Sequence, residues 1–140
     1  MLGMRNYTQD HLNVTRRRID AQLSAYQALA AATEAGPAAE ELATFAPVFF
    51  NNMVLALDAA FIHRLRVVEG KDGNPLNEVR SLASSLLDND GILTIEKSLK
   101  LKPDTSVLGL QAGDRIALDE TAFAKLADAF FAEIEKKFVA

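Results

Sequence analysis

Residues 45–68 read FAPVFFNNMVLALDAAFIHRLRVV and form the most apolar stretch of the chain. When they are projected onto a helix at about 100° per residue, apolar side chains fall on two sides. One side carries Phe45, Phe49, Met53, Ala56, Ala60 and Val67, and the other carries Val54, Leu57, Phe61, Leu65 and Val68. A helix that is apolar on two sides needs neighbours on both, so we expect a central helix over residues 45–69. Thr44 is its expected N-cap, and Pro47 is expected in its first turn.

Upstream of this stretch, apolar residues recur at helical spacing and predict a long first helix over residues 8–35. These residues are Leu12, Ile19, Leu23, Tyr26 and Ala30. The pair Gly36-Pro37 ends the helix, because glycine favours the C-terminal cap and proline cannot continue a helix. One helical turn is expected at residues 38–42. The basic run at residues 16–18 is interpreted as a solvated helix face, in preference to a patch for nucleic acid or an acidic partner.

Two further helices are predicted downstream of the apolar stretch. Asn74 supplies an N-cap followed by a proline, and apolar residues then repeat at three and four, which predicts a helix over residues 75–88. Asp119 is the expected N-cap of a last helix over residues 119–138, which carries a broad apolar stripe. Phe131 lies off that stripe, so we interpret it as an exposed contact or part of a dimer seam.

Between these two helices the hydrophobic period changes. Residues 92–101 alternate in polarity, as a half-buried strand does, and a second short strand is expected at residues 115–118. Residues 106–110 fit either a strand or one helical turn. The predicted architecture is mainly α: one domain over residues 1–140 that resembles a four-helix bundle, with a small antiparallel β ribbon at about 92–118 inserted before the last helix.

The composition narrows the classes of function. The 140 residues include 15 Lys+Arg and 19 Asp+Glu, which gives a net charge of −4, and 49% are hydrophobic. Cysteine is absent, which excludes disulfides, thiolate zinc sites and cysteine nucleophiles. The mild acidity argues against a nucleic-acid-binding protein, because phosphate contacts need clustered Lys and Arg. No apolar leader precedes Tyr7, and polar residues interrupt the stretch 45–68, so we expect a cytoplasmic protein without a membrane-spanning segment.

The densest group of functional-looking side chains lies around residues 63–80. On the projected helix, Asn52 and His63 lie about 20° apart, and Arg66 lies about 60° away. One interpretation is a pocket for a phosphate or carboxylate, in which basic side chains bind the anion and His63 acts as an acid or base. The candidate ligand-binding residues are Asn52, His63, Arg64, Arg66, Lys71, Asp72, Asn74 and Arg80.

The other interpretation of these residues is a structural clamp. Arg66 and Arg80 would then pair with nearby carboxylates and hold two helices together. The available carboxylates are Asp58, Glu69, Asp72 and Glu78. We prefer the clamp, because buried charges are usually paired and structural ion pairs perturb residues as functional sites do.

No catalytic residue, cofactor or metal ion is predicted. The two histidines, His11 and His63, are far apart in sequence and have no carboxylate partner at helical spacing. The sequence DNDG at residues 88–91 departs from a calcium loop, because Ile92 and Leu93 stand where a carboxylate or amide and then a glycine are needed. We interpret it as a turn.

The segment from Phe61 to Arg80 contains His63-Arg64-x-Arg66, followed by GKDGNPLNEVR at residues 70–80. It resembles the signature of a family of small bacterial proteins with no assigned function. The likeness extends to GDRI at residues 113–116 and to the last helix. The resemblance implies a class of protein and no activity.

From the residues themselves, we expect a non-catalytic helical protein that forms a homodimer or binds a protein partner. Long helices with surplus apolar faces are well explained by this function. The alternative is a binding protein or enzyme for a nucleotide or another small anionic ligand, which would use residues 63–66 and Lys71.

Overall fold

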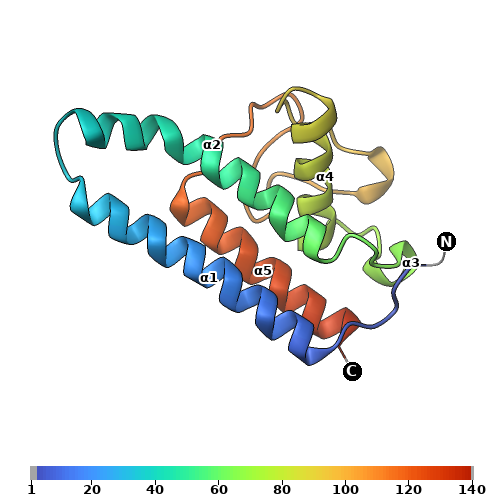
Figure 1. Ribbon diagram of the computed structural model, residues 1–140. Helices are drawn as coiled ribbons and strands as arrows, with labels where there is room; N and C mark the ends of the chain where they lie inside the picture. Colours follow the sequence, from blue (N-terminus) through green and yellow to red (C-terminus); the bar gives the residue numbers. More distant parts are fainter. Residues whose placement is uncertain (1–2, 140) are drawn as a thin grey trace.

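The computed structural model describes residues 3–139, and the fold over this range is mainly helical, as predicted (Figure 1). The helices are α1 (Gln9–Ala32), α2 (Pro37–Ala60), α3 (Arg66–Glu69), α4 (Pro75–Asp88) and α5 (Glu120–Phe138), with a 3₁₀ turn, η1, at Lys97–Leu99. α2 packs against α4 and α5, while α1 covers α5 and part of α2. Four longer helices therefore enclose one core.

Aromatic rings dominate this core. Its largest fully buried side chains include Phe50, Phe61, Phe123, Phe130 and Phe138. The rings of Phe50 and Phe123 stack with centroids 5.8 Å apart, and Phe61 contacts Phe130 at the same distance. Burying one such side chain contributes about 1.5–3 kcal/mol, so these contacts join α2 firmly to α5.

Side-chain caps set the start of the two C-terminal helices. Asn74 Oδ1 accepts hydrogen bonds from the backbone N–H groups of Leu76 and Asn77, at 2.9 and 3.2 Å. Asp119 Oδ1 accepts one from the backbone N–H of Ala122 at 2.8 Å. Both predicted caps are confirmed, and α4 begins and ends at the predicted residues.

The central helix begins earlier than predicted. α2 starts at Pro37, so the turn predicted at residues 38–42 is its first part. Thr44 is not an N-cap, because its hydroxyl donates to a backbone oxygen one turn earlier within the helix, and Pro47 also lies inside the helix. The reason is local: α1 ends at Ala32, three residues before its predicted end, Gly36 takes a φ of 88° as the N-cap of α2, and Pro37 suits the first helical position.

The central helix also ends earlier, at Ala60, so the helix predicted over residues 45–69 is wrong at both ends. The next residues leave the helix and pair with the N-terminal segment. The Met4 N–H donates to the His63 carbonyl oxygen at 2.6 Å, and the Leu65 N–H donates to the Met4 carbonyl oxygen at 2.9 Å. These partners are distant in sequence, so the hydrophobic periodicity carries no trace of them.

Both ends of the described chain meet at the same end of the molecule. The Tyr7 N–H donates to the Phe138 carbonyl oxygen at 2.6 Å, beside the last turn of α5. Figure 1 shows this end opposite the turn that joins α1 to α2. The α1–α2 turn projects beyond α5, so the molecule has one end closed by many contacts and one end formed by two helices.

The predicted β ribbon at 92–118 does not form, although the structure describes this whole range. An isolated antiparallel bridge joins Ile92 and Arg115, and no strand extends from it. The chain instead turns at Lys97–Leu99, and Lys100 takes a left-handed conformation with a φ of 56°. This turn interrupts the pairing that the alternating polarity predicts.

Side chains from α2 and α4 take the place of the missing strand partners. The Asn51 side chain donates to the Ile116 carbonyl oxygen at 2.9 Å and accepts from the Leu118 N–H at 3.1 Å. Residues 106–110 form neither the predicted strand nor a helical turn. Two of their backbone N–H groups donate to the Glu78 carboxylate, at 2.8 and 2.9 Å. The alternation in sequence therefore reflects alternating burial along an irregular segment.

Phe131 is buried, so the prediction of an exposed contact there is wrong. The Arg16 guanidinium lies 5.0 Å from the centroid of its ring and covers it from α1. Arg17 and Arg18 remain exposed, as the solvated-face interpretation expects. The stripe on α5 is thus wider than its own periodicity indicates, because a long cationic side chain can cover an aromatic ring.

Candidate functional site

The carboxylate of Glu69, fully buried at the end of α3, is the centre of the polar network. Arg64 Nε lies 2.8 Å from Glu69 Oε1, and Arg80 Nη2 lies 2.6 Å from the same oxygen. Asn77 Nδ2 donates to Glu69 Oε2 at 2.8 Å. A carboxylate is tolerated in the interior when its charge is paired and its lone pairs are occupied, and both conditions hold here.

The pKa of Glu69 reflects a competition between burial and pairing. Burial raises the pKa, whereas the hydrogen bonds from Arg80 and Asn77 and the charges of Arg64 and Arg80 lower it. Pairing prevails, so the pKa lies below its ordinary value of 4.5. Glu69 is therefore charged at neutral pH, and the network is a set of fully formed ion pairs.

Arg64 is buried as well and engages protein groups with all three guanidinium nitrogens. Besides Glu69, it pairs with Asp58 at 2.9 Å and donates to two backbone oxygens at 3.1 and 3.3 Å. Its guanidinium also lies 5.5 Å from the centroid of the Phe130 ring. With Arg80, the network therefore holds two guanidinium groups against two carboxylates, and its formal charges balance.

The loop at residues 70–74 is tied to this network by amide groups. Asn74 Nδ2 donates to the Glu69 carbonyl oxygen at 2.9 Å and to Asp72 Oδ1 at 2.7 Å. The bond from Asn74 is the main cause that lowers the pKa of Asp72. Gly73 has a φ of 85°, and a Cβ there would lie 2.7 Å from a facing backbone oxygen. The loop therefore needs glycine at this position.

The structure brings some of the predicted site residues together and separates others. Those that join the network are Arg64, Asp72, Asn74 and Arg80. Those that are exposed outside it are Asn52, His63, Arg66 and Lys71. The predicted alignment of Asn52 with His63 along one helix is wrong, because α2 ends at Ala60.

The contacts of Arg80 are those that the clamp interpretation predicts, since this side chain pairs with Glu69. Arg64, rather than Arg66, supplies the second buried guanidinium. Sequence reasoning missed Asn77 and Lys137, whose Nζ donates to the Glu69 carbonyl oxygen at 2.8 Å. The position of Asn77, one turn after the cap of α4, was a readable signal, whereas Lys137 reaches the network only through the packing of α5.

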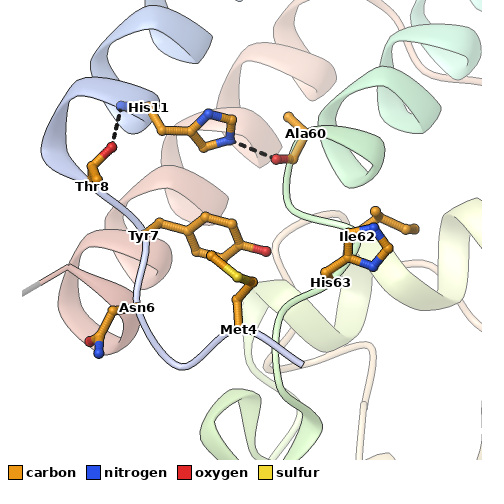
Figure 2. A pocket seen from close by; sticks show the side chains of 8 residues that line it. All are labelled: Met4, Asn6, Tyr7, Thr8, His11, Ala60, Ile62 and His63. Carbon is orange, nitrogen blue, oxygen red and sulfur yellow. Dashed lines mark hydrogen bonds between the residues drawn. The ribbon is translucent and has the colours of Figure 1, made fainter. Parts of the chain in front are cut away.

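A separate hollow of about 460 Å³ lies between the N-terminal segment and the end of α2 (Figure 2). Its lining is mostly apolar and comes from Met4, Asn6, Tyr7, Thr8, His11, Ala60, Ile62 and His63. The Tyr7 ring stacks on His11 with centroids 5.6 Å apart and meets Phe61 edge-on at 4.9 Å. The hollow therefore has an aromatic wall that is anchored in the core.

Two polar groups face this apolar lining. His11 Nε2 lies 2.8 Å from the Ala60 carbonyl oxygen, and because a carbonyl only accepts, this nitrogen carries the proton. The Tyr7 hydroxyl is buried without a well-formed hydrogen bond. Burial raises the pKa of Tyr7, although the charge of Arg64 and the His63 backbone lower it, so the phenol stays protonated at neutral pH. The hollow suits the burial of a small apolar group beside a phenol donor.

The turn between α1 and α2 lies at the opposite end of the molecule (Figure 1), and apolar side chains of both helices are exposed near it. Leu29, Phe45 and Val48 are 49%, 46% and 67% exposed. The rings of Phe45 and Phe49 stack at 5.6 Å, and adjoining hollows of about 310 and 260 Å³ share Leu29 and Phe45. We call this surface the hairpin face; it comprises Gln22, Ala25, Tyr26, Leu29, Thr33, Ala38, Glu41, Leu42, Phe45, Val48 and Phe49.

Length and composition alone would also allow α2 to cross a membrane. The core helix of a soluble protein passes the same test, and α2 buries Phe50, Val54 and Leu57 in the core.

Over residues 3–139, no group of three or more His, Asp or Glu side chains is placed to hold a metal ion.

Comparisons with protein-family models, with curated proteins and with solved structures gave no match. The resemblance of residues 61–80 to a family of small bacterial proteins therefore stays a prediction.

Proposed function

We propose that the protein is a non-catalytic helical domain whose hairpin face binds the same face of a second copy, which gives a homodimer. The observation that carries this proposal is the exposure of Leu29 and Phe45, which line two adjoining hollows, and of Val48, which neighbours Phe45 at i, i+3 spacing on α2. Single exposed apolar residues are ordinary, whereas a contiguous apolar surface marks an interaction site. Around it, α1 has no buried residue after Ile19, and α2 has none before Ala46.

Charges at the two ends of the hairpin face favour a second copy as the occupant. Arg18 is exposed and lies at nearly the same helical angle on α1 as Leu29. Glu41 lies at the other end, where it lines a hollow with Leu29 and Thr33. Along α1, Arg18 and Thr33 are about 22 Å apart at 1.5 Å per residue. A twofold axis near Ala25 would place Arg18 of each copy opposite Glu41 of the other.

The surface of α1 between these charges also suits a close contact between helices. It is built largely from small, exposed side chains: Ala21, Ala25, Ala28 and Ala32. The distance between packed helices depends on the side chains at the contact, so alanine allows a short distance. Two α1 helices that cross in antiparallel fashion would then bring both sets of exposed apolar residues together.

The first test is the oligomeric state of Val48→Glu, measured by analytical ultracentrifugation. We expect a wild-type dimer and a monomeric variant, because the interface would bury a charge without a partner. Leu87→Glu is the matched control, since Leu87 is exposed on α4, outside the hairpin face, and should leave the dimer intact. A wild-type protein that stays monomeric at its highest soluble concentration would refute the proposal, as would monomers that instead bind lipid vesicles through Val48.

The second test addresses the twofold arrangement through its charges. Arg18→Glu and Glu41→Arg should each raise the dimer dissociation constant several-fold, because each variant places like charges opposite one another. The double variant should restore the wild-type constant. Lys136→Glu makes the same charge change in the last turn of α5, at the end remote from the hairpin face, and should have little effect. Single variants that weaken the dimer without restoration in the double variant would exclude this arrangement.

A further inference from the structure

A polar hollow of about 240 Å³ lies beside α4, next to the segment that leads into η1. Its lining combines basic, hydroxyl and carboxylate groups, from Arg66, Arg80, Ser81, Ser84, Thr94 and Glu96. A neighbouring hollow of about 370 Å³ shares Arg66 and Arg80, so the two guanidinium groups are accessible from both. We call the first hollow the arginine groove.

Ser81 in this groove has an unused hydroxyl. The residue is 5% exposed, and its Oγ makes no hydrogen bond with the protein. In a helix, such a hydroxyl commonly donates to the backbone oxygen four residues earlier. Thr15, Thr33 and Thr44 do so in this protein, at 2.8, 2.8 and 3.2 Å. Ser81 departs from that pattern: it is a residue of the groove lining, and its buried hydroxyl keeps both a donor and an acceptor without a partner.

Arg66 is held in the groove by a weak ion pair. Its Nη2 lies 3.4 Å from Glu96 Oε2, and the two side chains are 45% and 61% exposed. Exposed pairs with such long contacts contribute little to stability, because water screens them and both side chains lose freedom. The Glu96 carboxylate is therefore easily exchanged for another anion.

Arg80 adds a second cation that is permanently charged. Its Nε and Nη2 donate to Glu69, which leaves Nη1 without a hydrogen bond to the described residues. Burial lowers the pKa of Arg80, but the bonds to Glu69 and the charges of Glu69, Asp58 and Glu96 raise it overall. Glu96 thus acts on both arginines and stands where an external anion would be attracted.

We propose that the arginine groove binds the phosphate group of a small phosphorylated molecule, which displaces the Glu96 carboxylate from Arg66. Guanidinium groups bind oxyanions through paired N–H donors, and the hydroxyls of Ser81 and Ser84 add further donors. A phosphate offers more acceptor oxygens to this set than a carboxylate does. The hollow is smaller than the roughly 300–1,000 Å³ of drug-sized sites, so the ligand is small. This site is independent of the hairpin face.

The test is a titration with inorganic phosphate, followed by NMR at an ionic strength held constant with chloride. We expect saturable shifts of the Ser81 and Ser84 amides and of the Arg66 and Arg80 Nε signals. A parallel titration with acetate separates phosphate from carboxylate ligands and should give weaker binding. Saturation by acetate alone would overturn the phosphate assignment. No saturable shift with phosphate, in the wild type or in Glu96→Gln, would overturn the site.

Two variants separate binding from folding. Glu96→Gln removes the competing carboxylate and should tighten phosphate binding several-fold, whereas Glu34→Gln makes the same charge change in the α1–α2 turn and should leave it unchanged. Ser81→Ala should weaken binding several-fold at unchanged thermal stability, because the hydroxyl has no partner in the fold. Equal tightening by Glu34→Gln, or unchanged binding in Ser81→Ala, would contradict the proposal.

Discussion

The two ends of this molecule differ in whether their side chains find partners within the chain. Around Glu69, charged groups are buried, yet each finds a partner: two guanidiniums face two carboxylates, and amides tie the loop at residues 70–74 to them. At the hairpin face, apolar groups are left in water although they would gain from burial. The first end pairs its buried charges within one chain, whereas the second gains from a partner.

The difference teaches where to look for function in this chain. Dense polar side chains in the sequence lead first to residues 63–80, yet many of these groups are used up by the fold. What remains unused includes the buried hydroxyls of Tyr7 and Ser81, the Nη1 group of Arg80, and exposed apolar surface on α1 and α2. Unsatisfied groups, more than dense ones, indicate a site.

The largest effect on stability is expected for Glu69→Gln, which breaks the buried network around Glu69. This variant leaves Arg64 buried with one carboxylate fewer, so we expect a loss of about 3–5 kcal/mol in the free energy of unfolding. Urea denaturation at neutral pH measures it. Glu96→Gln is the matched control and should cost less than about 1 kcal/mol, because the Arg66–Glu96 pair is exposed. Equal losses in the two variants would show that the buried network has no special weight.

A second comparison is contained within α2. Leu57 is fully buried, so Leu57→Ala should lower the free energy of unfolding by about 2–5 kcal/mol. Val48 lies in the same helix on the hairpin face, and Val48→Ala should change it by less than about 0.5 kcal/mol. Both are measured at low protein concentration, where a dimer would dissociate. A large loss in Val48→Ala under these conditions would mean that the hairpin face packs within the monomer.

The smallest effect is the pH dependence of the Glu69 network. The pKa of Glu69 is lowered in the fold, so its contribution to stability is present above the ordinary value of 4.5 and is lost as pH falls through the lowered pKa. The stability difference between wild type and Glu69→Gln should therefore shrink as the solution is acidified below pH 4.5. Glu78, whose pKa is raised by burial, titrates in both proteins and cancels from the difference. A difference that grows on acidification would contradict this sign.

Much of the fold is readable from local sequence signals. The caps at Asn74 and Asp119 place the starts of α4 and α5 correctly, because capping depends on neighbouring residues. The errors at the end of α2 and at residues 116–118 involve partners that are distant in sequence. Met4 draws residues 63–65 out of the expected helix, and Asn51 replaces the strand partner of residues 116–118.

The candidate site also combines features that local sequence predicts with features that depend on distant partners. Its location near residues 63–80 and the pairing of Arg80 with Glu69 follow from charge pattern and burial. The charge pattern does not indicate which arginine is buried. That depends on where α2 ends, which is decided by the pairing with Met4. The hairpin face is only partly visible in the sequence, because apolar residues of α2 look alike whether α5 covers them or not.

The hydrogen bonds that join Tyr7 to Phe138 and Met4 to His63 and Leu65 bring both ends of the described chain to the same end of the molecule. The first and last residues that the structure describes, Gly3 and Val139, lie next to these bonds, at the end remote from the hairpin face (Figure 1). A fusion at either point would extend away from the proposed contact. Two copies joined through their hairpin faces would then carry such attachments at opposite ends of an elongated dimer.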